Sequence, residues 1–259
     1  MLMCSEMMAQ DMLEATIEPS TLKETFEPAD VIVNECRLHL TDDGLWLRAA
    51  DPAIVATVEV HLEANAFESY RADDGVIGVN VSRLIEVAKL ASNDEMVDLE
   101  ISTKTNQLVV ESDGLEYSLA LLDTDTLRKE PEVPSELNLP AEVVMEGTYL
   151  DRGIRAAEMV SDHLRIRIEE DGDTFYLEAT GDTDQTRLEL DEQELSSLSA
   201  GRAESLFSLQ YLEAINKSVP AEGLVTLECG EELPARIQYD IDGSGPAVTY
   251  LLAPRLQQA

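Results

Sequence analysis

Basic residues are scarce in this sequence. The chain of 259 residues has 18 lysines and arginines against 53 aspartates and glutamates, a net charge of −35. Such a surface suits a cytoplasm holding molar salt, because the Debye length falls to about 3 Å at 1 M and repulsion between carboxylates is screened. We therefore interpret the protein as halophilic; the alternative is an ordinary acidic protein with an acidic, partner-facing surface. Intrinsic disorder is disfavoured because 44% of the residues are hydrophobic and recur periodically.

Cysteines and long apolar segments are also few. The three cysteines, Cys4, Cys36 and Cys229, are odd in number and far apart, so the sequence implies no disulfide framework and fits a reducing cytoplasm. No segment approaches the ~18–20 apolar residues of a membrane helix, and the first residues lack the basic segment and apolar stretch of a secretory signal. We expect a cytoplasmic protein without a membrane partner.

Motifs for catalysis and metal binding are missing as well. The sequence contains no GxSxG, GxGxxG or GxxxxGK[ST] pattern, and its three histidines share no ligand spacing. The Asp-Thr-Asp sequences at 123–125 and 182–184 could hold a cation, but solvated loops explain them better in a chain this acidic. We expect that the protein binds no cofactor and no metal and is not an enzyme. Two alternatives are a two-domain, acidic, β-rich hydrolase with a cleft at the linker, and an acidic scaffold that binds only proteins.

The strand patterns that are present occur twice. Alternating apolar residues predict strands at 31–40 and 45–49 around a turn that ends at Gly44, where glycine suits a positive φ. One offset of 128 residues relates four pairs: Gly44 and Gly172, Leu84 and Leu212, Lys89 and Lys217, and the strands at 97–100 and 225–228. We predict tandem copies of one α+β domain.

A proline-bearing segment separates the copies. Residues 121–140 contain three prolines and five acidic residues, and proline disfavours both a regular helix and a central strand. The predicted division is an extension at 1–11 that we expect to be disordered, a first domain at 12–122, a connector at 123–137, a second domain at 138–256 and a tail at 257–259.

Four helices are predicted, at 20–28, 82–92, 148–160 and 208–218, with the first stopped by Pro28 and the second N-capped by Ser82. They hold six acidic and six basic residues, so the net charge of the helices is zero. As a set they mark the one surface that could approach a polyanion without strong repulsion, although ordinary solvated helix faces explain any single residue equally well. The basic residues are Lys23, Arg83, Lys89, Arg152, Arg155 and Lys217.

Four short segments carry a family resemblance. They are Gly44–Leu47 with Ala50-Asp51-Pro52, Ser69-Tyr70-Arg71 with Ile77–Val81, Phe207–Leu212, and Tyr250–Leu256. In their order and spacing, from about Met12 to Leu256, the chain resembles the sliding clamps of the proliferating cell nuclear antigen (PCNA) family, particularly archaeal and haloarchaeal members.

The resemblance implies a ring-shaped homotrimer with β-sheets outside and two helices per domain on the inner face. Such a ring is a processivity factor that encircles duplex DNA without reading its sequence. The subunits would pair a strand at 115–121 with a strand at 174–179 of the next. The chain departs from the family where Asp30, Glu86 and Gln210 occupy positions that often carry a basic residue.

The resemblance also implies protein partners: DNA polymerase, the clamp loader, flap endonuclease and DNA ligase, docking through motif peptides that contain a glutamine and aromatic residues. Ser208 would lie beside the glutamine pocket, and either Leu127 or Val133 would supply the apolar contact of the connector. The remaining groove residues would be Val55, Pro234, Ala253, Pro254 and Leu256.

Overall fold

The computed structural model describes residues 12–255 apart from 93–94, 103–104, 133–136, 170–173, 192, 200 and 242–244. The predicted extension at 1–11 and tail at 257–259 lie outside the described residues, as do Val133, Gly172 and Leu256.

The elements occur twice in nearly the same order. The first series is β1 (Leu13–Ile17), α1 (Pro19–Asp30), β2 (Glu35–Thr41), β3 (Gly44–Ala50), β4 (Ala56–Glu63), the 3-10 helix η1 (Ala64–Ala66), β5 (Ser69–Ala72), β6 (Gly75–Asn80), α2 (Val81–Ala88), β7 (Val97–Ser102), β8 (Gln107–Ser112) and β9 (Leu115–Ala120). The second is β10 (Ala141–Glu146), α3 (Gly147–Glu158), β11 (His163–Ile168), β12 (Phe175–Thr180), β13 (Gln185–Leu190), β14 (Ser197–Ser199), β15 (Ala203–Ser208), α4 (Leu209–Asn216), β16 (Leu224–Cys229), β17 (Ala235–Asp240) and β18 (Ala247–Leu252). The offset of 128 residues carries α2 onto α4, so the predicted α+β class and tandem repeat are confirmed.

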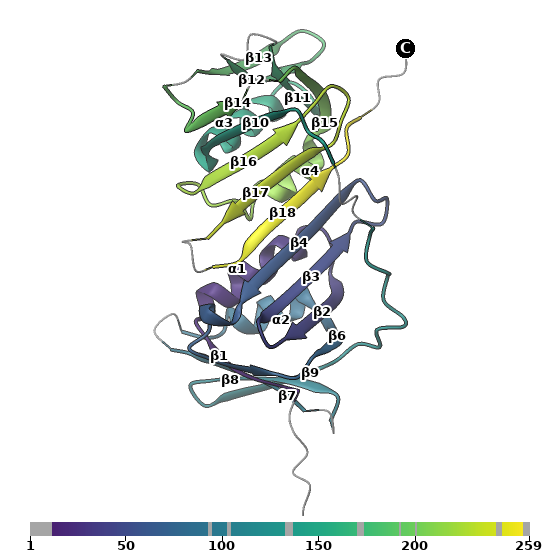
Figure 1. The fold of residues 1–259 in the computed structure, drawn as a ribbon, viewed down its shortest axis with the longest axis vertical. Coiled ribbons are helices and arrows are strands. Elements are labelled where there is room, and N and C mark those ends of the chain that lie inside the picture. Colours follow the sequence, from purple (N-terminus) through teal and green to yellow (C-terminus); the bar gives the residue numbers. More distant parts are fainter. Residues whose placement is uncertain are drawn as a thin grey trace, which may run out of the picture.

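Three antiparallel sheets make up the described part of the chain. A nine-stranded sheet, β14-β10-β16-β17-β18-β4-β3-β2-β6, runs through both copies because β18 of the second pairs with β4 of the first. Figure 1 shows this sheet in front of the helices, with the five-stranded sheet β5-β1-β7-β8-β9 and the four-stranded sheet β13-β12-β11-β15 at opposite ends. The helices pack in pairs, α1 with α2 and α3 with α4, leaving the nine-stranded sheet one face free of helices.

Alternation of side chains in the strands positions the core. In β2, Cys36, Leu38 and Leu40 are buried while the residues between them are half-buried, as expected for a strand with one face on the core. The hairpin from β2 to β3 turns at Gly44, whose φ is +140°; a Cβ there would lie 2.1 Å from the Leu62 carbonyl oxygen. The predicted glycine turn is therefore confirmed.

Two predictions about helix ends are wrong. Pro28 does not stop α1, which continues to Asp30, since Pro28 is itself buried and its carbonyl accepts a hydrogen bond of 3.0 Å from the Tyr250 hydroxyl. Tertiary packing thus outweighs the local cost of proline near the last turn. Asn80, and not Ser82, caps α2: its side-chain oxygen accepts from the Arg83 N–H at 2.9 Å. The Ser82 hydroxyl instead donates to the Asp30 carboxylate.

The prediction of a subunit-pairing strand at 174–179 is also wrong. β12 covers this stretch and pairs with β11 on one side and β13 on the other, so its backbone groups are already taken. Among the described strands, β13 forms the outer edge of the four-stranded sheet, and β9 forms an edge of the five-stranded sheet. An alternating sequence cannot distinguish an inner strand from an edge strand, because both show the same period of two.

Candidate functional site

Three predicted groove residues lie side by side where the central strands β4, β18 and β17 of the nine-stranded sheet begin or end. Ala56, Leu252 and Ala235 are opposite one another across β4, β18 and β17. Val55, Ala253 and Pro234 are the next residues along these three strands, and all three are half-buried. The Ala253 N–H donates to the Val55 carbonyl oxygen at 2.8 Å, so β-sheet register holds them side by side.

The chain beyond β18 continues this surface along β15. The Arg255 N–H donates to the Leu206 carbonyl oxygen at 2.7 Å, which places Pro254 beside the second copy. A cavity of about 240 Å³ lies here, lined on one side by Ser205 and Leu206. Ser208, the predicted neighbour of a glutamine pocket, ends β15 and precedes α4.

A buried carboxylate anchors the loop that leads to Val55. Asp51 is only 6% exposed. Its Oδ1 accepts from the N–H groups of Val55 (2.6 Å) and Ala56 (2.8 Å), and its Oδ2 from Ala53 N–H (2.9 Å) and the Tyr211 hydroxyl (3.0 Å). Burial by itself raises the pKa of Asp51, but the four hydrogen bonds together outweigh burial and hold the pKa below its ordinary value.

This anchor joins the two copies and presents an apolar side chain. Tyr211 lies on α4, so its hydrogen bond to Asp51 links the second copy to a loop of the first. Within the loop Ile54 has a φ of +57°, an unusual backbone conformation for a β-branched residue. Its exposed fraction is 63%. Ile54 was not among the predicted groove residues; composition alone gives no signal for it, since the exposure follows from the strained loop.

Charged side chains bind the connector to the first copy through hydrogen bonds. Arg37 donates to the Thr124 carbonyl oxygen at 2.7 Å, and Glu130 Oε1 lies 2.5 Å from Nε2 of His39. Arg128 reaches the carbonyl oxygens of Asp51 at 2.6 Å and Pro52 at 2.9 Å. The connector is thus attached both to the sheet and to the loop that holds Val55.

Between the connector and the sheet lies a cavity of about 460 Å³ that the sequence did not indicate. Arg128 lines its rim, and its apolar lining includes Ile32, Val33, Ala50 and Pro52. The resemblance did include Ala50 and Pro52, as neighbours of Asp51 in one matching segment, but nothing in the sequence shows that Arg128 reaches over them.

Leu127 lies at β6, beside Gly78. A Cβ at Gly78 would come within 2.8 Å of Leu127 Cδ1 and 2.5 Å of the Leu122 carbonyl oxygen, so the end of the first domain and the start of the connector both pass directly over this glycine. β2 and β3 separate β6 from β4, which begins directly after Val55. The structure therefore brings Val55, Pro234, Ala253 and Pro254 to one end of the sheet, with Leu127 apart from them.

The six basic residues of the helices lie on their solvent side. Arg83, Lys89 and Arg155 are 61%, 60% and 74% exposed and form loose ion pairs of 3.6–3.9 Å with carboxylates of the same helix pairs. Arg152 and Lys217 are also exposed, and Lys23 is half-buried. With Lys89 and Lys217 counted at the C-caps, the observed helices carry six basic and seven acidic residues, a net charge of −1. The predicted zero was slightly wrong because α1 extends to include Asp30.

No group of three or more histidine, cysteine or acidic side chains in the described part of the chain is arranged to hold a metal ion. No helix in that part is long and apolar enough to cross a membrane.

Comparisons with known proteins agree with this architecture. Residues 12–126 match the family described as proliferating cell nuclear antigen, N-terminal domain. The chain is 48% identical over 246 residues to a DNA polymerase sliding clamp of Halobacterium salinarum, covering 95% of this chain and 99% of that protein. A sliding clamp of Natronomonas pharaonis is 45% identical with the same coverage.

Solved structures show the same fold. A. fulgidus PCNA bound to the C-terminal region of FEN-1 aligns with a TM-score of 0.89 at 34% identity, covering 96% of this chain and all of that one. PCNA from Thermococcus kodakaraensis aligns with a TM-score of 0.86 at 25% identity, covering 94% and 100%. With close haloarchaeal relatives over nearly its whole length and the same duplicated α+β fold, this chain belongs to the proliferating cell nuclear antigen family of DNA polymerase sliding clamps.

Proposed function

We propose that three copies of the chain close into a ring around duplex DNA and act as a processivity factor. The observation that carries this proposal is the joint between β18 and β4. The last strand of the second copy pairs there with the fourth strand of the first, and the equivalent strands, β9 and β13, are sheet edges at opposite ends of the molecule. The same head-to-tail joint can therefore repeat between chains, and such an interface forms a ring when its rotation closes.

The helices would line the hole of this ring. Lys23, Arg83, Lys89, Arg152, Arg155 and Lys217 would face the DNA. Phosphate binding weakens by roughly 0.9 log unit per contact for each tenfold rise in salt, so these cations would give little standing affinity in molar salt. A closed ring needs little, because it is retained by topology. A helical surface with a net charge near zero only has to avoid repelling the DNA as the ring slides.

Partner proteins would dock at the aligned ends of β4, β17 and β18 in the nine-stranded sheet. Val55, Pro234, Ala253 and Pro254, with Ser208 beside them and Leu256 beyond, would receive motif peptides of DNA polymerase, the clamp loader, flap endonuclease and DNA ligase. The peptide-bound A. fulgidus PCNA supports this use of the fold. Residues 123–137 would act as the connector between domains 12–122 and 138–256, with Leu127 or Val133 as its apolar contact.

The clamp would perform no bond chemistry itself. Tethering raises the effective concentration of an enzyme at its substrate, often into the millimolar range for short flexible links. The acidic composition and the haloarchaeal relatives support a site of action on DNA in a high-salt cytoplasm.

The decisive experiment is to load the protein with its clamp loader onto circular DNA and then to linearise half of the sample. We expect retention on the circle and rapid loss from the linear molecule, because a ring can slide off free ends. Equal loss from both would refute the encircling ring, and a strict monomer by native mass measurement in high salt would refute the trimer.

A further inference from the structure

A row of acidic residues crosses the solvent-exposed face of the five-stranded sheet and ends at the edge strand β9. Asp98 on β7, Glu111 on β8 and Glu116 on β9 are directly opposite one another across the five-stranded sheet. All three are exposed. Like charges opposite one another on a sheet are destabilising, so this row is unfavourable in the single chain. A cation beyond Glu116 would relieve it.

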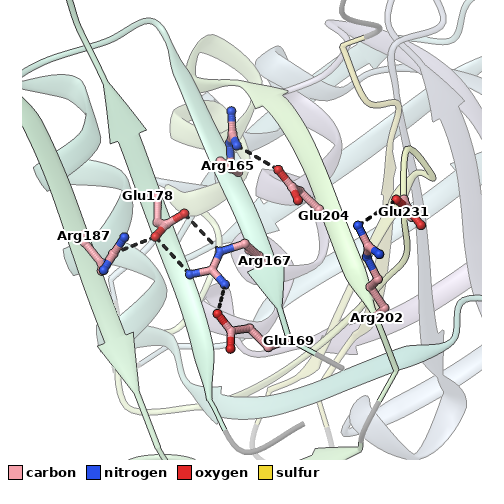
Figure 2. Close-up of polar contacts among 8 residues, drawn as sticks. All are labelled: Arg165, Arg167, Glu169, Glu178, Arg187, Arg202, Glu204 and Glu231. Atoms are coloured by element: carbon pink, nitrogen blue, oxygen red, sulfur yellow. Dashed lines mark hydrogen bonds and ion pairs between the residues drawn. The ribbon is translucent and has the colours of Figure 1, made fainter. Parts of the chain in front are cut away.

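The edge strand β13 presents a row whose outermost member is basic. Arg187 is opposite Glu178 on β12, which in turn is opposite Arg165 on β11. Figure 2 shows Glu178 between Arg187 and Arg167. Arg187 Nε donates to Glu178 Oε1 at 2.7 Å, yet the Arg187 side chain stays 62% exposed.

Glu178 does not depend on Arg187 for its charge balance. Arg167, only 19% exposed, lies 3.2 Å from the same carboxylate and stacks with its Cζ 3.9 Å from the centre of the Tyr176 ring. A guanidinium has five N–H donors, so Arg187 can keep its bond to Glu178 and bind a second carboxylate on its open side.

The joint inside the chain gives the register for a joint between chains. Val58 of β4 is opposite Tyr250 of β18, and Glu59 is opposite Thr249. The repeat offset of 128 residues carries Glu59 of β4 onto Arg187 of β13. Tyr117 corresponds to Tyr250 through the strand pairing. Leu99 and Leu227, which are 128 residues apart, are opposite Val110 and Ile237, and these are opposite Tyr117 and Tyr250 respectively.

Transferring this register sets Tyr117 opposite Thr186 and Glu116 opposite Arg187. On the inward side of the same strands it brings Leu115, which is 41% exposed in the single chain, opposite the half-buried Leu188. Opposite residues in an antiparallel pair point to the same face, so Glu116 and Arg187 would meet on the outer surface.

We infer that Arg187 of one subunit pairs with Glu116 of the partner subunit and selects the register and polarity of the joint. This inference rests on the proposed ring. The joint inside the chain has Glu59 and Thr249 at this position and hence no opposite charges, so the ion pair distinguishes the joint between chains from the one within. Pairing of β9 with a second β9 would instead bring two acidic edges together.

Charge reversal tests the pair. We expect Arg187→Glu and Glu116→Arg each to weaken assembly on the order of ten-fold when summed over the joints of one ring, because each replaces an opposite pair by a like pair. The double variant should recover assembly, and an equimolar mixture of the two single variants should assemble better than either alone, since their mixed joints restore opposite charges. Sedimentation equilibrium in 1 M KCl would measure the association of the subunits for each variant and for the mixture.

Arg202→Glu is the matched control. Arg202 lies on the same face of the four-stranded sheet, is 58% exposed and pairs with Glu231. It directly precedes β15, which forms the edge opposite to β13. It should leave assembly unchanged, and Arg187→Gln should give an intermediate loss without introducing a like charge. A wild-type trimer whose assembly is unaffected by Arg187→Glu, or not recovered in the double variant, would overturn this inference alone. A wild-type monomer would overturn both it and the proposed ring.

Discussion

Removing the Asp51 carboxylate should destabilise the protein by an amount that depends on which donors it leaves without a partner. Asp51→Ala removes the acceptor of all four hydrogen bonds. The Ala56 N–H is fully buried and loses its acceptor completely, whereas Ala53 is exposed and Val55 half-buried, so water can reach them. At about 1–3 kcal/mol for a buried unsatisfied donor and less for the others, we expect a loss of about 3–4 kcal/mol.

Asp51→Asn should cost less, about 1–2 kcal/mol. The amide keeps one oxygen, which can still accept from the N–H groups of Val55 and Ala56. Its NH₂ group would face the Ala53 N–H, a clash of two donors at an exposed position, and the Tyr211 hydroxyl, which can rotate and accept. The order alanine, then asparagine, then wild type therefore tests the hydrogen-bond geometry and not merely the loss of charge.

The assay is chemical unfolding in buffered molar KCl, with Asp74→Asn, at an exposed carboxylate, as the control. The pH dependence adds a second test. The pKa of Asp51 is lowered on folding from its ordinary 3.8, so its stabilisation is fully present above that value and is lost as the pH falls through the folded pKa. Wild type should therefore lose more stability than Asp51→Asn below about pH 4. Equal unfolding midpoints for all variants, or parallel pH profiles, would refute the reasoning.

Two further predictions concern the connector. Gly78→Ala should displace it, because the new Cβ would lie 2.5 Å from the Leu122 carbonyl oxygen; we expect faster proteolysis of the connector with assembly unchanged, and an unaltered cleavage rate would contradict the tight contact. Replacing both Leu127 and Val133 by Asp should weaken binding of a partner motif peptide while the ring stays assembled, measured by titration calorimetry and sedimentation; an unchanged affinity would remove both residues from the groove.

Local sequence features predicted the elements well where a short-range rule applied. Gly44 was recognisable as a turn because few residues other than glycine tolerate a φ of +140°. The repeat was visible because each copy must bury the same faces, which keeps Leu84 and Leu212 apolar and equally spaced. Local rules failed at Pro28 and Ser82, where the packing of Tyr250 and the side chain of Asn80 decided the helix ends.

Candidate site residues were harder to predict than elements. Val55, Pro234 and Ala253 are adjacent only because three strands align in register, and the sequence suggested this set through family resemblance and not through spacing. Ile54 and the reach of Arg128 over Pro52 were missed, because a strained loop and a long-range hydrogen bond leave no periodic pattern.

The sequence by itself determined the α+β class, the duplication and the surplus of negative charge away from the helices, because composition and periodicity record which faces are buried and which are solvated. Only the tertiary structure decided which strands remain open at the edges. β12 and β13 have similar alternating sequences, yet β12 is paired on both sides and β13 on one, so the pairing of whole strands, and not any property of a single strand, places Arg187 at an edge.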